Sequence, residues 1–312
     1  EKLGFSKEEV DTAFQSQFGP EKWVGPQTVK HVAELAELMV GRRVLLTVDK
    51  APAAPRDVKL SVTGLTVRDR RGVVMVEDVS FDVKAGEIVG IAGVAGNGQS
   101  ELLEALAGIR RAESGRIAML GRDIDPSQEV DPAEIRRMGC AHVPEDRHHM
   151  GLVLPFEENE NAILGYQGDP RFAKGLLLDR DAMRRDAEAK IKAYDIRPPD
   201  CRLKTSNFSG GNQQKIVLAR EMERDPDVLL IGQPTRGVDV GAIEFIHRRI
   251  IEMRDAGKAI LLVSVELDEI RALSDRILVM FGGRIVGERS PDAGEGELGL
   301  LMAGIEGQEA AE

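Results

Sequence analysis

Hydrophobic and polar positions alternate in different ways along this chain, and the pattern predicts strands and helices in alternation from about residue 58. Residues 58–67 and 73–83 alternate polar with apolar positions, which predicts an antiparallel pair of strands. Residues 88–92, 228–231 and 259–263 form short runs that are almost wholly apolar, as in strands buried at the centre of a sheet. Residues 179–194 combine many charges with an apolar stripe, which is typical of a surface helix.

Composition and turn residues mark the boundaries of this pattern. Pro52 and Pro55 favour extended backbone and predict a linker, and a short helical pattern precedes it at residues 32–39. The pair Gly282-Gly283 between two apolar runs predicts a hairpin turn. The predicted ranges are an N-terminal segment of residues 1–50, a linker of 51–57, an α/β domain of 58–306 and a tail of 307–312.

Charge and cysteine content narrow the classes of function. The formal net charge of −11 argues against nucleic acid as the main partner, because phosphate binding needs a basic surface. Cys140 and Cys201 lie far apart without metal-ligand spacing, so both are predicted to be free thiols of a reducing cytosol. No apolar run approaches the length of about 20 residues that spans a bilayer. His148 and His149 are adjacent, a poor geometry for a metal, so a surface loop is predicted there.

A glycine-rich segment, G-V-A-G-N-G-Q-S at residues 93–100, follows one buried strand and precedes a predicted helix over 100–106. Its glycines let backbone N–H groups turn inward around an anion, and the helix N-terminus adds positive potential. The phosphate-loop pattern G-x-x-x-x-G-K-[ST] is complete except that Gln99 takes the place of lysine, while Ser100 is retained as a ligand for Mg²⁺. Taken alone, this segment is equally consistent with a glycine-rich turn that binds nothing.

A second glycine motif, F-S-G-G-N-Q-Q-K, occupies residues 208–215. Ser209 is predicted to cap a helix whose first-turn amides are left open by Gly210 and Gly211. Such a helix start is a second anion site built from backbone dipoles. An apolar strand and then the segment G-Q-P-T-R-G-V-D at residues 232–239 follow it.

The phosphate loop, this signature helix and the apolar strand, in this order, resemble the ATP-binding cassette (ABC) family over about residues 58–306. The resemblance implies a P-loop NTPase fold of ABC type, in which a mixed central sheet carries an antiparallel β subdomain and a helical signature subdomain at about 131–222. The wording of the signature and of V-P-E-D-R at 143–147 resembles the simple-sugar and nucleoside importer branch, whose chains carry two cassettes. Residues 33–42 resemble the tail of a preceding cassette, so the chain resembles a second, C-terminal cassette without the first.

The resemblance also indicates a damaged site for ATP and Mg²⁺. The family's Mg²⁺-binding aspartate, catalytic glutamate and switch histidine fall on Gly232, Gln233 and Val265, none of which carries charge. The glutamine that senses the γ-phosphate falls on Glu145. ATP hydrolysis at this site is therefore predicted to be absent or very weak. The expected nucleotide contacts are Gly93, Gly96, Asn97, Gly98, Gln99, Ser100, Glu101 and Glu145, with Ser100 also the expected metal ligand.

Cassettes of this family pair head to tail, so the resemblance places the intact signature against the ATP of a second cassette, with Asp239 in the dimer-contact loop. Residues 155–166 resemble the region that contacts a membrane permease, and a solvated loop and helix is the alternative for that segment. The implied partners also include, indirectly, a substrate-binding protein. The implied location of this chain is peripheral, at the cytoplasmic face of the cell membrane. Two other functions stay open: a non-catalytic truncated cassette and a soluble ABC protein outside transport. The signature residues are Ser209, Gly210, Gly211, Asn212 and Gln213, and the permease-facing residues are Glu158, Asn159, Asn161 and Ala162.

Overall fold

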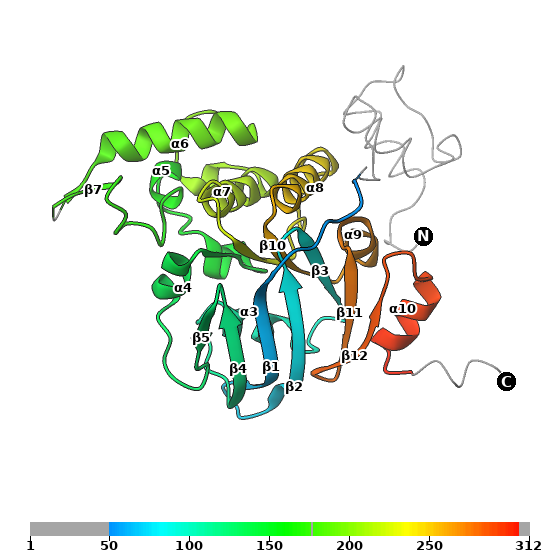
Figure 1. Ribbon diagram of the computed structural model, residues 1–312. Helices are drawn as coiled ribbons and strands as arrows, with labels where there is room; N and C mark the ends of the chain where they lie inside the picture. The colour runs from blue at the N-terminus through cyan, green and yellow to red at the C-terminus, as the bar shows by residue number, and fades with distance from the viewer. Residues whose placement is uncertain (1–49, 176, 306–312) are drawn as a thin grey trace, which may run out of the picture. The chain divides into compact units, whose positions relative to one another are not determined.

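The computed structural model describes residues 50–175 and 177–305, which belong to one compact unit. Two large sheets, a small two-stranded sheet and a group of helices make up this unit (Figure 1). The predictions for residues 1–49, including the resemblance to a preceding cassette, and for the tail at 307–312 lie outside the described residues.

The first sheet is antiparallel and has the strand order β2-β1-β4-β5. Its first two strands pair from Val58 opposite Lys84 to Arg68 opposite Val74, so the predicted antiparallel pair is confirmed. Alternate residues of both strands are buried, which is the pattern of a sheet with one face against a core. The strands are β1 (Val58–Arg68), β2 (Val74–Lys84), β4 (Ser114–Met119) and β5 (Arg122–Ile124).

The second sheet is mixed and has the order β12-β11-β3-β10-β9-β6. Its inner strands run parallel, and only β11 and β12 pair antiparallel, across the predicted Gly282-Gly283 turn. The three short apolar runs are its fully buried strands β3, β9 and β10, as predicted. The strands are β3 (Glu87–Ala92), β6 (Cys140–Val143), β9 (Val228–Gly232), β10 (Ala259–Ser264), β11 (Arg276–Phe281) and β12 (Arg284–Arg289).

The mixed sheet separates two hydrophobic cores, which explains why strands β3, β9 and β10 are apolar except at their ends, where Glu87 and Ser264 lie. In β3, Val89 and Ile91 face the core shared with the antiparallel sheet, whereas Ile88 faces the opposite core. Helix α3 (Gln99–Leu106) contributes Leu102 and Leu103 to the first core, between the two sheets. The second core lies on the opposite face of the sheet, under the helices of residues 180–194, 210–222 and 240–255. Since both faces of the mixed sheet are covered, the interior positions of its central strands favour apolar side chains.

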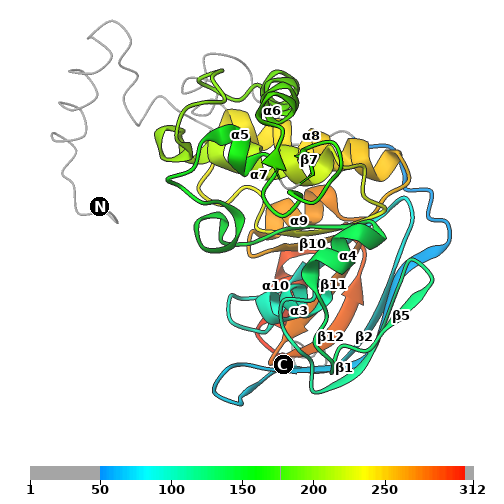
Figure 2. The same ribbon diagram turned by 90° about the vertical axis from the view of Figure 1, so that its left-hand side faces the viewer.

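On the other face, α5 (Glu158–Asn161), α6 (Arg180–Tyr194) and α7 (Gly210–Met222) lie close together, whereas α10 (Glu295–Met302) lies beside β11 (Figures 1 and 2). Strand β6, which falls within the range predicted to be a helical subdomain, instead belongs to the mixed sheet, because it pairs with β9. The elements are α4 (Pro132–Met138), the π-helix η2 (Arg147–Gly151), α5 (Glu158–Asn161), β7 (Ala173–Lys174), β8 (Leu177–Leu178), α6 (Arg180–Tyr194), the 3₁₀-helix η3 (Thr205–Asn207), α7 (Gly210–Met222), α8 (Val240–Asp255), α9 (Leu267–Leu273) and α10 (Glu295–Met302).

These layers confirm the predicted fold class, a mixed central sheet with an antiparallel sheet and a helical part. The surface helix expected at residues 179–194 is α6, which begins after the capping side chain of Asp179. No helix in the described part of the chain combines the length and apolar character that crossing a bilayer requires. Both cysteines are free, as the spacing predicted, and the structure shows that both are also buried.

Candidate nucleotide site

The glycine-rich segment forms a tight loop between the end of β3 and the start of α3. Gly96 and Gly98 have φ angles of 91° and 99°, a left-handed backbone that favours glycine. A Cβ on Gly98 would lie 1.9 Å from the Met75 carbonyl oxygen, so no other residue fits there. The Asn97 side chain accepts a hydrogen bond from the Gly282 backbone N–H at 2.9 Å, which ties the loop to the β11–β12 turn. The first amides of α3 have no acceptor within their helix and are available to an anion.

Gln99 lies folded back against this loop rather than reaching into solvent. Its side chain is buried, and its Nε2 donates a hydrogen bond to the Val94 carbonyl oxygen at 3.1 Å. A Cβ on Gly93 would lie 2.3 Å from the same Nε2, so the amide fills the space beside the loop. The position where the phosphate-loop pattern has an ammonium group therefore holds a neutral amide that is already hydrogen-bonded.

Ser100 and Glu145 meet at the start of α3. The Ser100 hydroxyl donates a hydrogen bond to Oε2 of Glu145, which follows strand β6 and is half-buried. Burial raises the pKa of the Glu145 carboxyl group; the bond from Ser100 opposes that rise, and the charge of Glu101 adds to it. A hydroxyl and a carboxylate oxygen thus converge behind the phosphate loop, and hard oxygen ligands of this kind suit Mg²⁺.

The three positions expected to be degenerate lie at the ends of β9 and β10. Gly232 ends β9, and Gln233 follows it with a φ angle of 48°, unusual for a residue with a side chain. The buried Gln233 side chain accepts a long hydrogen bond, 3.4 Å, from the Val265 backbone N–H. Val265 is 40% exposed and presents no titratable group. The site therefore has a loop shaped for phosphate but no charged side chain at these three positions.

The signature motif begins helix α7 as predicted. Ser209 is exposed, and its hydroxyl oxygen accepts hydrogen bonds from the Asn212 backbone N–H at 3.4 Å and side-chain Nδ2 at 2.8 Å. A Cβ on Gly211 would lie 2.8 Å from a carboxylate oxygen of Asp239, and Asp239 itself caps α8 by accepting from the Ala242 N–H. The glycines therefore let the helix start pack directly on the loop of Asp239.

Gln213 has a contact that the motif did not reveal. Its side chain is buried, its Nε2 donates to the carbonyl oxygens of Phe208 and Thr205, and its Oε1 bonds with His148 Nε2 at 2.8 Å. Gln213 thus fixes the backbone of residues 205–208, which lead into the signature helix. His148 is exposed, but the predicted surface loop is a π-helix capped by Asp146. The two segments are far apart in sequence, so local patterns could not indicate this pairing.

The segment expected to contact a permease buries its polar side chains. Glu158 and Asn161 are fully buried, and Asn161 Nδ2 donates to the Thr205 hydroxyl at 2.8 Å. Burial raises the pKa of Glu158 to about 8, and the charge of Lys190 opposes that rise. Within residues 50–175 and 177–305, neither carboxyl oxygen of Glu158 has a hydrogen-bond partner. The alternative of a solvated loop and helix is wrong for these buried residues. For the same reason, Glu158, Asn159, Asn161 and Ala162 offer no surface of their own to a permease, whereas Phe156 nearby is 43% exposed.

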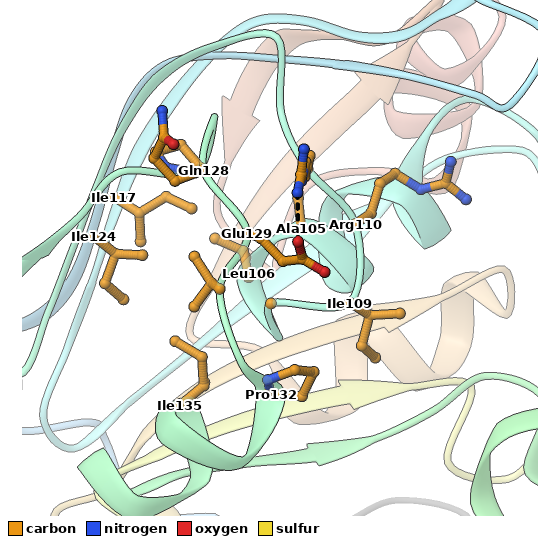
Figure 3. A pocket seen from close by; sticks show the side chains of 14 residues that line it. Ala105, Leu106, Ile109, Arg110, Ile117, Ile124, Gln128, Glu129, Pro132 and Ile135 are labelled. Atoms are coloured by element: carbon orange, nitrogen blue, oxygen red, sulfur yellow. Dashed lines mark hydrogen bonds and ion pairs between the residues drawn. The ribbon is translucent and has the colours of Figure 1, made fainter.

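A separate cavity of about 270 Å³ lies between the C-terminal end of α3, the antiparallel sheet and α4 (Figure 3). Apolar side chains such as Leu106, Ile117 and Ile135 line it. Glu129 at its edge accepts an ion-pair hydrogen bond from Arg111. None of the predicted nucleotide contacts lines this cavity, so it is not the phosphate site.

A phosphate loop on the central strand of a mixed sheet, with a capped glycine signature at the start of α7, defines an ABC-type nucleotide-binding domain. The ABC transporter family model matches residues 76–236, and the chain belongs to that family. The ferrochelatase family model matches residues 1–48. The first family match spans the phosphate loop, Glu145, the signature and the end of β9.

Relatives and solved structures agree with this assignment. The chain is 51% identical over 89% of its length to the guanosine import ATP-binding protein NupO of Bacillus subtilis, and 46% over 87% to the nucleoside import ATP-binding protein NupA of Lactococcus lactis. It covers 54% and 53% of these proteins, so it spans about half the length of the relatives it matches. Within the family it groups with such nucleoside and sugar import proteins.

The solved structures establish the fold alone. A nucleotide-free ATP-binding cassette from an ABC transporter is similar with a TM-score of 0.64 at 21% identity, covering 79% of this chain and 96% of that one. The dimeric post-hydrolysis cassette MJ0796, bound to ADP and Pi, has a TM-score of 0.64 at 20% identity and covers 75% of this chain and 100% of its own.

Proposed function

We propose that this chain is the second-cassette part of the ATP-binding subunit of a nucleoside or simple-sugar importer. Its own ATP site holds nucleotide without hydrolysing it, and its signature helix completes the ATP site of a partner cassette. The relatives support the transport role, because they are import ATP-binding proteins for guanosine, nucleosides, glucose and ribose. The signature motif is intact, whereas Gly232, Gln233 and Val265, at the positions expected to be catalytic, carry no charge. This contrast supports a role for the chain in a partner's ATP site and not in hydrolysis at its own.

The uncharged side chains at the expected catalytic positions argue that this site does not hydrolyse ATP. Gln233 stands where a general base would be, and removal of a general base typically lowers a rate by about 10²–10⁴-fold. Gln99 supplies an amide in place of an ammonium group, and a charge-assisted hydrogen bond contributes about 1.5–3 kcal/mol to phosphate binding. Gly232 and Val265 add neither charge nor a proton acceptor, so none of the residues at these positions activates water.

The signature argues for a role toward a neighbour. Ser209 is exposed at the start of a 13-residue helix, and its hydroxyl and the first amides of α7 form a preorganised set of hydrogen-bond donors. Donors of this kind stabilise the charge on a transferring phosphoryl group. Asp239 packs against Gly211, so a contact that moves the Asp239 loop also moves the start of the signature helix.

The same proposal assigns the remaining partners. Phe156 offers an exposed aromatic surface to a permease, while the buried polar residues of α5 hold that surface in place. The permease and a substrate-binding protein select the transported molecule. The chain then acts at the cytoplasmic face of the membrane as a peripheral subunit, with ATP and Mg²⁺ as its cofactors.

ATPase assays of the purified chain, alone and mixed with a hydrolysing cassette from an import ATP-binding relative, test this proposal. We expect no turnover by the chain alone and stimulated turnover in the mixture. Ser209→Arg should abolish the stimulation by filling the donor surface, whereas Ser127→Arg on an exposed loop should not. Vigorous turnover by the chain alone, or a mixture that is indifferent to Ser209→Arg, would refute the proposal.

A further inference from the structure

The space at the end of β9 is filled by a side chain from another segment. A Cβ on Gly232 would lie 2.5 Å from Cγ of Glu145, 3.0 Å from the Glu145 backbone nitrogen and 3.0 Å from Leu103 Cδ1. Real Cβ atoms do not approach other atoms to 2.5 Å, so a side chain at position 232 and Glu145 in its present place exclude each other. Glycine at 232 and glutamate at 145 are therefore a matched pair.

Glu145 uses that space to reach the phosphate loop. Its Oε2 accepts the hydrogen bond from the Ser100 hydroxyl, at the second residue of α3. The neighbouring charges that act on it are those of Glu101, Glu104 and Arg236. The carboxylate that β9 lacks is thus present in the same region, supplied by the segment after β6.

These two oxygens suit a divalent cation. Mg²⁺ prefers one or two carboxylate or hydroxyl ligands and takes its other ligands from water and phosphate oxygens. In residues 50–175 and 177–305, no group of three or more His, Cys, Asp and Glu side chains is placed to hold a metal alone. A nucleotide phosphate is therefore needed to complete the coordination.

We propose that Glu145 has replaced the missing acidic residue of β9 as the anionic ligand for a divalent cation, and that Gly232 is present to make room for it. The inference rests on the proposed nucleotide site and adds that nucleotide binding there depends on a divalent cation. Gln99 contributes no positive charge, so without a cation the Glu145 carboxylate repels the phosphates. With a cation, the same carboxylate holds the metal against Ser100. Nucleotide binding here consequently requires the metal.

The test measures the affinity of the full chain for ATP with Mg²⁺ and with EDTA. We expect Mg²⁺ to strengthen binding of the wild-type chain strongly. Glu145→Gln should reduce that gain by about 10–100-fold, the range for one charge-assisted interaction, and should improve binding in EDTA. Glu129→Gln, on an exposed ion pair with Arg111, is the matched control and should behave as wild type. An unchanged Mg²⁺ gain in Glu145→Gln, or equal affinity of the wild type with Mg²⁺ and EDTA, would overturn the inference.

A second measurement separates metal binding from folding and from turnover. Mn²⁺ binding in the presence of ADP, followed by electron paramagnetic resonance, should weaken in Glu145→Gln at unchanged thermal stability. The exchange variant Gly232→Asp with Glu145→Ala should recover Mn²⁺ binding, because it returns the carboxylate to β9 and removes the Cγ that would clash with a side chain at position 232. Failure of Glu145→Gln to weaken Mn²⁺ binding contradicts the inference. None of these results depends on Ser209, so the proposed function fails or holds separately in the mixed-cassette assay.

Discussion

Addition of a single methyl group at Gly232 should destabilise this domain, against the usual effect of replacing glycine by alanine. Gly232 lies in a strand and is not among the residues with positive φ, so alanine fits its backbone. Such a replacement normally stabilises by about 0.4–1 kcal/mol through the unfolded state. Here the new Cβ lies 2.5 Å from Glu145 Cγ and 3.0 Å from Leu103 Cδ1. Because overpacking typically costs about 1–3 kcal/mol, we expect the free energy of unfolding to fall by about 1–2 kcal/mol.

Denaturant unfolding of four chains measures this effect: wild type, Gly232→Ala, Glu145→Ala and the double variant. Glu145→Ala removes the clashing Cγ, so Gly232→Ala should cost less in that background, by about 1 kcal/mol or more. Gly296→Ala is the control, because Gly296 lies within α10 with no atom within 4 Å of its Cβ position; it should stabilise by about 0.5–1 kcal/mol. If Gly232→Ala is as stable as wild type, or costs the same in both backgrounds, the steric pairing of Gly232 with Glu145 is refuted.

Three further predictions concern charge and burial. Gln99→Lys should raise ATP affinity by about 10–100-fold, since it restores an ammonium group at the loop, yet leave turnover absent because Gln233 is unchanged; calorimetry and an ATPase assay measure the two quantities. Burial raises the pKa of Glu158 to about 8 from 4.5, so its protonated form is favoured by folding and the free energy of unfolding should decrease as pH rises from about 4.5 to about 8. Glu158→Gln should remove that part of the pH dependence, and equal slopes for wild type and variant in denaturant titrations across this range would contradict it. Burial raises the pKa of the Cys140 thiol to about 12 and also raises that of Cys201, so a thiol reagent at pH 8 should label neither cysteine before unfolding and both after it.

The local sequence pattern by itself determined the main strands, the phosphate loop and the start of the signature helix. The apolar runs of β3, β9 and β10 and the alternation in β1 and β2 follow from side-chain periodicity, because a strand buried on both faces accepts only apolar residues. The phosphate loop and the Ser209 cap are equally local, since left-handed glycines and a capping hydroxyl act within a few residues of themselves.

Contacts between distant segments were decided only by the tertiary structure. Three such features depend on how separate elements pack together. Glu145 fills the space beside Gly232, His148 forms a hydrogen bond with Gln213, and Glu158 is buried. By motif alone, Gly232 and Glu145 are two independent departures from the family pattern. Their geometry shows that the two positions share one volume, and no periodicity or spacing along a chain encodes which side chain fills it.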